Sequence, residues 1–513
     1  MAGASPAAAM RDEAHDALAA VRAAEARRVE VLARAAKAVV CVFSDRQRGG
    51  GGSGVVIDPA GYGLTNFHVV QPFIESRRGF GGLSDGRLYP LRVLGIDPGG
   101  DVAMFKLEGK DHFDYAPLGD SDALRVGQWV AAMGNPFMLA EDFSPTVTLG
   151  VISGLHRYQK GQGNLLEYAD CIQVSTSINP GNSGGPLFDL DSRVIGINGR
   201  ASFEERGRVN VGLGYAVSIN QIKRVMPSLW AGRLVEHGTL GATVRGIGGE
   251  LLVSAIQAFS AAERAGVQLG DELLELAGRR LRTPNDYNNL LATLPANWPV
   301  RLKLRRNGQL LDATARLDRL PLRMPLLYVV DIEHNHAELA KLLDRHAQTV
   351  YAKPGMPPAK IVFARPVGND GAAGDRLFAV AVSEKASTAP SLAFEPRPEG
   401  VIGRAVVAEW RNILQPLFAR SKPDLNWELL AGDEVRGRIA GVIERRFEDG
   451  RHIRWKLDWQ TAELLQVALG DEDETERVVW TPRAPTPFGE VFWPREWTRR
   501  TRAGQESVFE IES

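Results

Sequence analysis

Residues 179–187 read NPGNSGGPL, a turn in which one serine stands among glycines and asparagines. Glycine permits backbone angles and close approaches that other residues resist. Such a turn can expose the Ser183 hydroxyl while the N–H groups of Gly181 and Ser183 point at one spot, as an oxyanion hole requires. An ordinary glycine-rich hairpin is the alternative for this segment taken alone, because such turns are common. The turn therefore predicts a nucleophile only if a base stands elsewhere in the chain.

A histidine upstream can supply that base, which a serine hydroxyl needs before it becomes a good nucleophile. His68 lies in the run GYGLTNFHVV, where a predicted strand ends and leaves a polar side chain at its edge. A lone histidine is more often structural, and it serves as a base only when an acid orients its ring. We therefore look for a carboxylate that could lie beside His68.

Two aspartates compete for this orienting role. Asp101 directly precedes the apolar run VAMFKL, so a buried strand should fix its position. Asp97 precedes a Pro-Gly-Gly sequence and belongs to the turn itself. We prefer Asp101, with Asp97 as the alternative.

The elements around these residues read as mainly β. From residue 38 to about 218, short β-rich runs alternate with Gly and Pro turns, which favours a sandwich or a pair of small barrels over a βαβ sheet. Residues 12–37 have the spacing of one surface or assembly helix, and 220–235 read as a closing helix. The active-site candidates thus lie in one all-β region.

The remainder of the chain divides into two further regions. Residues 239–318 mix strands with two short helical patterns and a predicted Asn307-Gly308 hairpin turn, which indicates a compact α+β module. Residues 320–513 have no legible fold. Seven of the ten tryptophans lie there, and we interpret them as core side chains, with a ligand groove as the alternative. The motif EHNH at 333–336 is expected to cap the following helix, with a metal site as the weaker alternative.

Composition narrows the function classes. With 513 residues, 44% of them hydrophobic and 24% charged, the chain should form several globular domains. A net charge of -1 gives no overall field for nucleic acid or an anionic membrane. Cys41 and Cys171 both lie in apolar runs and read as buried thiols, with one disulfide between them as the alternative. No export signal or membrane span is visible, so the sequence as written predicts a cytoplasmic protein.

Three segments together resemble the catalytic motifs of the HtrA/Deg family of trypsin-like serine proteases: GYGLTNFHVV at 61–70, DVAMFKL at 101–107 and SINPGNSGGPL at 177–187. The resemblance implies a chymotrypsin-like double β-barrel over 38–235, preceded by a helical segment at 1–37. It also implies that His68, Asp101 and Ser183 form the catalytic triad, in the chymotrypsin order. No metal or organic cofactor is implied.

The same resemblance suggests where a substrate would lie. The GLGYAV run places Gly214, Tyr215 and Ala216 beside an added substrate strand. The base of the primary specificity pocket falls at Ser177, with Ile178 next to it. An uncharged serine there predicts cleavage after small or medium apolar residues, because a buried Lys or Arg would lack a carboxylate partner. Glu204 and Glu205 are the acids that could overturn this expectation.

Residues 239–318 resemble a bacterial PDZ domain of the kind that follows HtrA proteases. Such a domain holds a peptide's C-terminal carboxylate on the backbone of a loop, which here contains Thr239, Leu240, Gly241 and Ala242. Thr239 and Ala242 are smaller than the apolar residues usual there, so a packing role is the alternative.

These features predict a serine endopeptidase that cleaves unfolded or exposed peptide segments, as HtrA-like proteins do in protein quality control. The alternative is a non-catalytic peptide-binding or chaperone protein that uses the PDZ and C-terminal surfaces. Expected partners are peptide substrates and peptide C-termini, without nucleic acid. HtrA-like proteins are often trimers and often periplasmic, and residues 1–37 are a candidate assembly segment.

Overall fold

The computed structural model falls into two compact units, which we describe separately. The first comprises Met1–Val225 with Leu234–Tyr328, and the second comprises Met226–Arg233 with Val329–Ser513. The residues that the structure describes are 6–46, 51–135, 141–159, 168–203, 210–320, 332–350, 362–367, 378–383, 391–395, 409, 413, 427–471, 476–482, 485–488, 491–494 and 496–512. No helix among them is long and apolar enough to cross a membrane.

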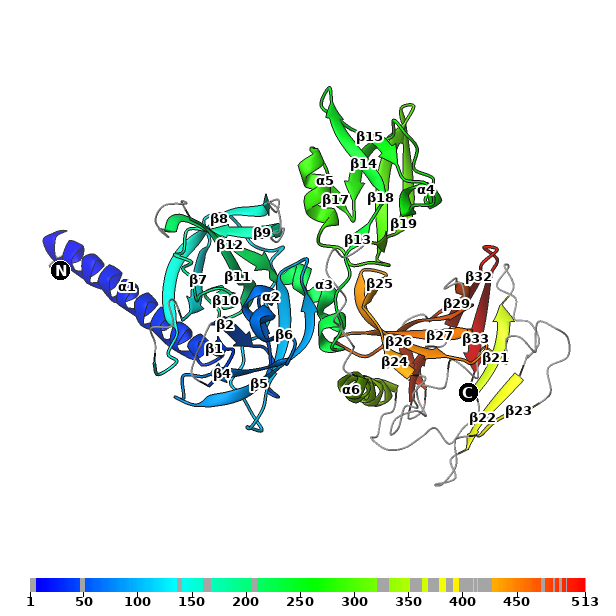
Figure 1. Cartoon of the computed structure of the whole chain (residues 1–513), viewed down its shortest axis with the longest axis horizontal. Helices are drawn as coiled ribbons and strands as arrows, with labels where there is room; N and C mark the ends of the chain where they lie inside the picture. The colour runs from blue at the N-terminus through cyan, green and yellow to red at the C-terminus, as the bar shows by residue number, and fades with distance from the viewer. Residues whose placement is uncertain are drawn as a thin grey trace, which may run out of the picture. The chain divides into compact units, whose positions relative to one another are not determined.

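The first half of the region predicted at 38–235 is a closed barrel with the strand order β1-β2-β3-β6-β5-β4 (Figure 1). Its interior is filled by branched and aromatic side chains such as Val42, Leu91 and Phe105, which strands accommodate well. A short helix, α2, and a 3-10 turn, η1, follow β3. The bounds are β1 Val39–Phe43, β2 Gly51–Val56, β3 Tyr62–Thr65, α2 Phe67–Val70, η1 Gln71–Phe73, β4 Arg78–Gly82, β5 Leu88–Asp97 and β6 Val102–Leu107.

The second half is another closed barrel, with the order β10-β11-β12-β9-β8-β7. The two barrels confirm the predicted chymotrypsin-like double barrel and decide against a sandwich. Cys41 in the first barrel and Cys171 in the second are buried thiols, as predicted. The bounds are β7 Trp129–Gly134, β8 Thr146–Gln159, β9 Tyr168–Val174, β10 Pro186–Phe188, β11 Val194–Phe203 and β12 Asn210–Ser218.

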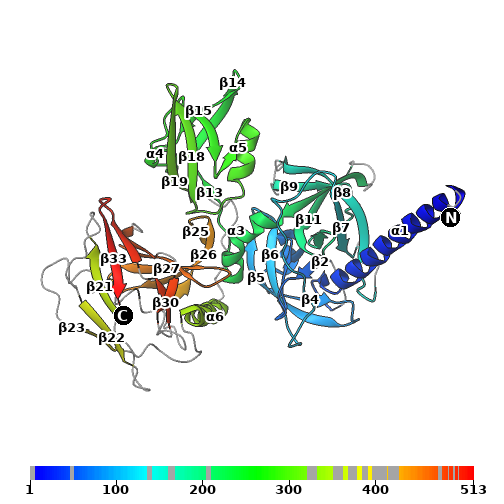
Figure 2. The same cartoon turned by 180° about the vertical axis from the view of Figure 1, so that it is seen from behind.

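Two helices flank the barrels. Helix α1, Pro6–Ala36, stands away from them in both views, and Val31 and Ala35 near its end are buried (Figures 1 and 2). Helix α3, Ile219–Trp230, ends earlier than the predicted 220–235. Gly232 has a φ of 71°, and the N–H of Arg233 bonds to the carbonyl of Ser228, which is the glycine-terminated pattern that stops helices.

The PDZ region is an α+β module, as predicted. Its main sheet has the order β14-β15-β16-β18-β19, with β17 paired to β16. Asn307 and Gly308 both have positive φ and join β18 to β19, so the predicted hairpin turn is confirmed. The bounds are β13 Gly238–Thr239, β14 Ala242–Ile247, β15 Glu250–Ile256, α4 Ala261–Arg264, β16 Glu272–Leu276, β17 Arg279–Arg280, α5 Pro284–Leu291, β18 Pro299–Arg306, β19 Gln309–Arg316 and β20 Asp318–Arg319.

The second unit contains a large antiparallel sheet with the order β23-β22-β21-β33-β32-β29-β28-β27-β26-β24, and β25 pairs with β26. Strands β30 and β31 form a separate pair. The bounds are α6 Ile332–Val350, β21 Val362–Val367, β22 Phe378–Ser383, β23 Ser391–Glu395, β24 Trp427–Leu429, β25 Asp433–Val435, β26 Arg438–Arg446, β27 His452–Asp458, β28 Leu464–Gly470, β29 Glu476–Pro482, β30 Pro485–Phe488, β31 Val491–Pro494, β32 Glu496–Thr501 and β33 Glu506–Glu512.

Tryptophans form much of the core of this unit. Trp427 and Trp455 stack with ring centroids 4.9 Å apart, and Trp480 and Trp497 are also buried. The core interpretation is confirmed for these four side chains. The EHNH motif does not precede a helix but lies within the first turns of α6, where the Asn335 amide bonds to both backbone groups of Leu429.

Lys456 provides a test of this second unit. Its side chain is 2% exposed, and its ammonium lies 3.0 Å from the Asp433 carboxylate and 3.2 Å from that of Glu476. Lys456→Met should lower the free energy of unfolding by roughly 3–5 kcal/mol, because it strands a buried carboxylate. Denaturation followed by tryptophan fluorescence measures this. Arg451→Ala, which removes an exposed ion pair to Asp449, should cost at most about 1 kcal/mol; equal losses would contradict the prediction.

Candidate active site

The predicted base and acid lie side by side in the first barrel. The Nδ1 atom of His68 is 2.8 Å from Oδ2 and 3.1 Å from Oδ1 of Asp101, and the His68 backbone N–H donates to Oδ1 at 3.0 Å. The Asp101 side chain is fully buried, whereas that of His68 is 36% exposed. Burial alone would lower the pKa of His68, but the hydrogen bond and charge of Asp101 outweigh it and raise this pKa above its usual value. His68 can therefore face a substrate while Asp101 orients its ring.

Local backbone geometry explains why Asp101, and not Asp97, reaches His68. Asp101 has a φ of 54° at the end of the turn between β5 and β6, and the Asn66 amide donates to its carbonyl at 2.8 Å. Asp97 is occupied elsewhere. Its Oδ1 accepts from the Gly100 N–H at 2.8 Å and lies 2.7 Å from Nε2 of His237. The preferred acid is thus the one that the structure brings to His68.

Ser183 comes from the second barrel and is held against the first by Ser53. The Ser53 N–H donates to the Ser183 carbonyl at 2.8 Å, and its hydroxyl donates to the Gly181 carbonyl at 2.6 Å. The same hydroxyl accepts from the Asn135 N–H at 2.9 Å, and the Thr65 hydroxyl donates to the Ser53 carbonyl at 2.6 Å. We call this group of contacts around Ser53 the barrel seam. No sequence motif pointed to Ser53, which lies between two glycines in the middle of β2.

The backbone of the serine turn leaves two particular donors available. The N–H groups of Asn182, Gly184 and Gly185 each bond to a backbone carbonyl. By contrast, the N–H groups of Gly181 and Ser183 donate to no acceptor within the part of the chain that the structure describes. These are the two groups that the sequence predicts for an oxyanion hole. An oxyanion placed there would be stabilised by preorganised donors.

The Ser183 hydroxyl is turned toward β11 in this structure. Its Oγ donates to the Gly199 carbonyl at 2.8 Å, and no hydrogen bond to His68 is present among the described residues. A side-chain rotation about χ1 must therefore precede transfer of its proton to His68. Catalytic hydrogen bonds are often absent before substrate binds, so this geometry is compatible with a resting site.

The predicted substrate-binding strand requires correction. In β12, Gly214 pairs with Ala201 and Val174, and Ala216 pairs with Asn198 and Ile172, so both edges of the strand are already used. Tyr215 likewise faces Gln173 of β9. A substrate strand therefore cannot add at Gly214, Tyr215 and Ala216 without displacing a barrel strand.

The free edge belongs to β11. Its ladder with β10 ends at Ile197, and Asn198 then bonds to the backbone of Gly184 and Gly185. From Gly199 to Phe203, β11 has a ladder partner only in β12 within the described residues. Because the Gly199 carbonyl also touches Ser183, this edge is next to the nucleophile.

The two predicted pocket residues differ in their surroundings. Ser177 is exposed, and its carbonyl accepts from Thr148 and Asn182 side chains at 3.3 Å. Ile178 is buried in the core of the second barrel, and its Cδ1 would lie 2.7 Å from a Cβ built on Gly214. Ile178 is therefore the predicted pocket residue whose apolar side chain packs against Gly214 of β12. Glu204 and Glu205 lie outside the described residues.

The PDZ loop is partly occupied by its own side chains. The Thr239 hydroxyl accepts from the Gly241 N–H at 3.2 Å, and the Tyr287 hydroxyl donates to the Ala242 carbonyl at 2.8 Å. Leu240 is buried, and its carbonyl accepts from the Ala262 N–H. A peptide carboxylate that binds the Gly241 N–H would have to replace its bond to the Thr239 hydroxyl.

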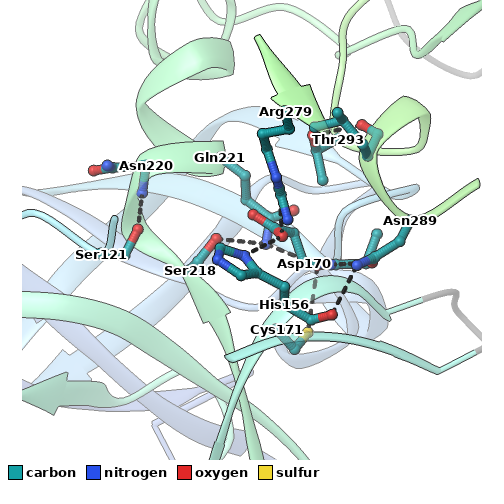
Figure 3. Close-up of polar contacts among 12 residues, drawn as sticks. Ser121, His156, Asp170, Cys171, Ser218, Asn220, Gln221, Arg279, Asn289 and Thr293 are labelled. Atoms are coloured by element: carbon teal, nitrogen blue, oxygen red, sulfur yellow. Dashed lines mark hydrogen bonds and ion pairs between the residues drawn. The ribbon is translucent and has the colours of Figure 1, made fainter. Parts of the chain in front are cut away.

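Asp170 of β9 connects the protease barrel to the PDZ module, and sequence reasoning missed it (Figure 3). Its N–H donates to Oδ1 of Asn289 at 2.6 Å, and its carboxylate lies 2.8 Å from both His156 and Arg279. Burial would raise the pKa of Asp170, but the hydrogen bond from His156 and the hydrogen bond and charge of Arg279 lower it to about 2. The Asn289 amide also donates to the His156 carbonyl at 2.9 Å. A single aspartate in an ordinary strand gives no signal of such a role.

Comparisons with known proteins agree with this geometry. Residues 52–197 match the trypsin-like peptidase domain family, and residues 252–306 match the PDZ domain family. The chain is 34% identical over 283 residues to the periplasmic serine endoprotease DegP of Salmonella typhimurium, covering 52% of this chain and 57% of that one. It is 32% identical over 282 residues to a DegP-like periplasmic serine endoprotease of Chlamydia muridarum, covering 53% and 54%. The chain thus spans about half the length of the curated relatives it matches.

A solved structure, the HtrA-type protease AlgW with a tripeptide, is 31% identical, covers 57% of this chain and 98% of that one, and has a TM-score of 0.47. The matched region is a trypsin-like peptidase domain followed by a PDZ domain. Through this region the chain is similar to serine proteases of the HtrA/Deg type. Its relatives are named periplasmic, and no finding supports the expected cytoplasmic location.

The two aspartates of the β5–β6 turn should differ sharply in their effect on catalysis. Asp101→Asn should lower kcat by about ten-thousandfold, because His68 loses the group that fixes its tautomer and stabilises its charge. Asp97→Asn should have a much smaller effect, since its partner is His237. Initial rates of casein cleavage measure both. A greater loss from Asp97→Asn would mean that the wrong acid has been assigned.

Proposed function

We propose that this chain is a serine endopeptidase that cleaves unfolded or exposed peptide segments in protein quality control. The observation that carries the proposal is the combination at one site of the oriented His68–Asp101 pair with two available N–H donors beside Ser183. A partly exposed histidine on a buried carboxylate does not by itself indicate catalysis, because His156 and Asp170 form a similar pair; the N–H donors beside Ser183 distinguish the His68 site. The DegP relatives are named serine endoproteases, which supports the same activity for this chain.

The reaction follows from the roles of these groups. Ser183 releases the Gly199 carbonyl, transfers its proton to His68 and attacks the scissile carbonyl carbon. The N–H groups of Gly181 and Ser183 stabilise the resulting oxyanion, while Asp101 stabilises the protonated imidazole. His68 then donates its proton to the leaving amine, which leaves an acyl-enzyme on Ser183. Water, deprotonated by His68, hydrolyses this ester and restores the serine.

The free edge of β11 explains a preference for unfolded substrates. A peptide that pairs with Gly199–Phe203 must be extended and must expose its own backbone N–H and C=O groups. Residues within a folded domain have these groups engaged already. We also retain the proposal of small or medium apolar residues before the cleaved bond, with Ser177 and Ile178 as candidate pocket residues.

Two partners belong to the same proposal. Peptide C-termini would bind the loop at Thr239–Ala242, which joins β13 to β14. A second and third copy of the chain could assemble through α1, on which Leu18, Val21 and Val29 are exposed apolar side chains. This part of the proposal rests on α1 alone.

Loss of the nucleophile tests the proposed activity. Ser183→Ala should leave the fold intact and lower casein turnover by up to about a millionfold, because triad members act as a unit. Ser76→Ala, a hydroxyl deletion in a surface loop of the first barrel, is the matched control and should cleave casein normally. Undiminished cleavage by Ser183→Ala would reject the proposal; no cleavage by wild-type protein would favour the non-catalytic binder.

The PDZ loop gives a separate prediction, measured on full-length Ser183→Ala protein to prevent cleavage. A fluorescent peptide with an apolar C-terminal residue should bind with a free carboxylate and lose binding when amidated. Adding Thr239→Val should tighten binding by roughly two- to tenfold, because the peptide no longer displaces the Thr239 hydroxyl from the Gly241 N–H. Fluorescence anisotropy measures all three affinities. Equal binding of free and amidated peptides would leave this domain with a packing role.

A further inference from the structure

Asp101 has a second side-chain partner besides His68. The Tyr168 hydroxyl donates a hydrogen bond to Asp101 Oδ2, the same oxygen that lies 2.8 Å from His68 Nδ1. Tyr168 is 4% exposed and Asp101 is fully buried, so water cannot replace this donor. Hydrogen bonds to a buried charged group are stronger than those between neutral groups.

Tyr168 belongs to the barrel that carries the nucleophile. It is the first residue of β9 in the second barrel, whereas Asp101 and His68 belong to the first. A Cβ built on Gly199 would lie 2.5 Å from the Tyr168 ring, so this ring packs directly against the strand whose carbonyl holds Ser183. Tyr168 therefore fills the space between the acid and the strand next to the serine.

The backbone of β9 next to Tyr168 is anchored by contacts of Asp170. Two residues along β9, Asp170 adopts a φ of 49° and is held by His156, Arg279 and Asn289, as Figure 3 shows. A side chain whose supporting backbone is anchored in this way can hold a partner in one orientation. A tyrosine on a frayed strand end could not do so.

We propose that Tyr168 is a positioning residue that orients the carboxylate of Asp101 and, through it, the imidazole of His68. This inference rests on the proposed protease function. Tyr168 does not touch the reacting atoms. Its hydroxyl holds Oδ2 of Asp101 in place, and its hydrogen bond partly neutralises the charge of this carboxylate, which otherwise acts on His68 alone.

Tyr168→Phe should therefore change both rate and pH dependence. We expect kcat to fall by roughly ten- to a hundredfold with KM changed less than about twofold, since a hydrogen bond to a buried charge is lost. The acid limb of the pH profile should move to higher pH, because an Asp101 carboxylate without its donor favours protonated His68. Among the described residues, Cys171 is another titratable side chain near Asp101, and burial raises the pKa of its thiol so that it stays neutral.

The pH profile is measured from inactivation rates with a fluorophosphonate, which reports the nucleophile without a peptide substrate. Tyr89→Phe is the matched control, because it removes a tyrosine hydrogen bond of 2.7 Å to Asp85 in the first barrel. It should leave rate and profile unchanged. If Tyr168→Phe also leaves both unchanged, or lowers the rate without moving the acid limb, the proposal is wrong.

A second variant keeps the test valid should Tyr168→Phe fold poorly. Replacing Tyr168 with 3-fluorotyrosine retains the donor and makes it more acidic, so the acid limb should move to lower pH. An unmoved limb, or one moved upward, would overturn the proposal. Wild-type protein that reacts with neither fluorophosphonate nor casein would instead reject the proposed protease function, and the two failures are thereby distinguishable.

Discussion

The proposed catalysis depends on keeping two barrels in fixed register, because neither barrel holds all of the candidate site residues. His68 and Asp101 come from the first barrel, whereas Ser183 and its N–H donors come from the second. The barrel seam meets this constraint through Ser53, which is fully buried and uses its N–H, hydroxyl and carbonyl in hydrogen bonds. Buried polar groups that are fully satisfied specify one arrangement, since any slip would leave several unpaired at once.

The PDZ module and its linker each contact a residue next to an element of the candidate site. His237, in the linker that precedes the module, holds Asp97 at the start of the turn that carries Asp101. Asn289 and Arg279, in the module itself, hold Asp170 on the strand that carries Tyr168. The turn that carries Asp101 and the strand that carries Tyr168 are therefore both stabilised by residues outside the barrels.

Much of the protease region could be predicted because its signals are local. Apolar runs separated by glycine turns specify strands, and the serine turn and the strand-edge Asp101 are read from neighbouring residues. The substrate edge could not be read this way. Whether Gly214 or Gly199 lies at a free edge depends on which strands flank it, and that is a property of barrel closure. Ser53, Tyr168 and Asp170 were missed for the same reason, since each acts on residues far along the chain.

The second unit was the least predictable part, although its tryptophans indicated a core. Its strands are short and irregularly spaced in sequence, and Pro-rich breaks interrupt the pattern. The EHNH motif shows how a local interpretation was incomplete there: Asn335 lies within α6 and bonds to the backbone of Leu429, a strand residue far along the chain. Such long-range partners are set by packing and not by neighbouring sequence.

The central claim is that Ser183, His68 and the N–H groups of Gly181 and Ser183 form one working site once the serine leaves Gly199. A crystal structure of the adduct with diisopropyl fluorophosphate tests it most directly. The account predicts phosphorus bonded to Ser183 Oγ, a phosphoryl oxygen about 3 Å from both N–H groups, and no remaining bond from Oγ to the Gly199 carbonyl. An adduct on another residue, or a phosphoryl oxygen directed away from these N–H groups, would contradict it.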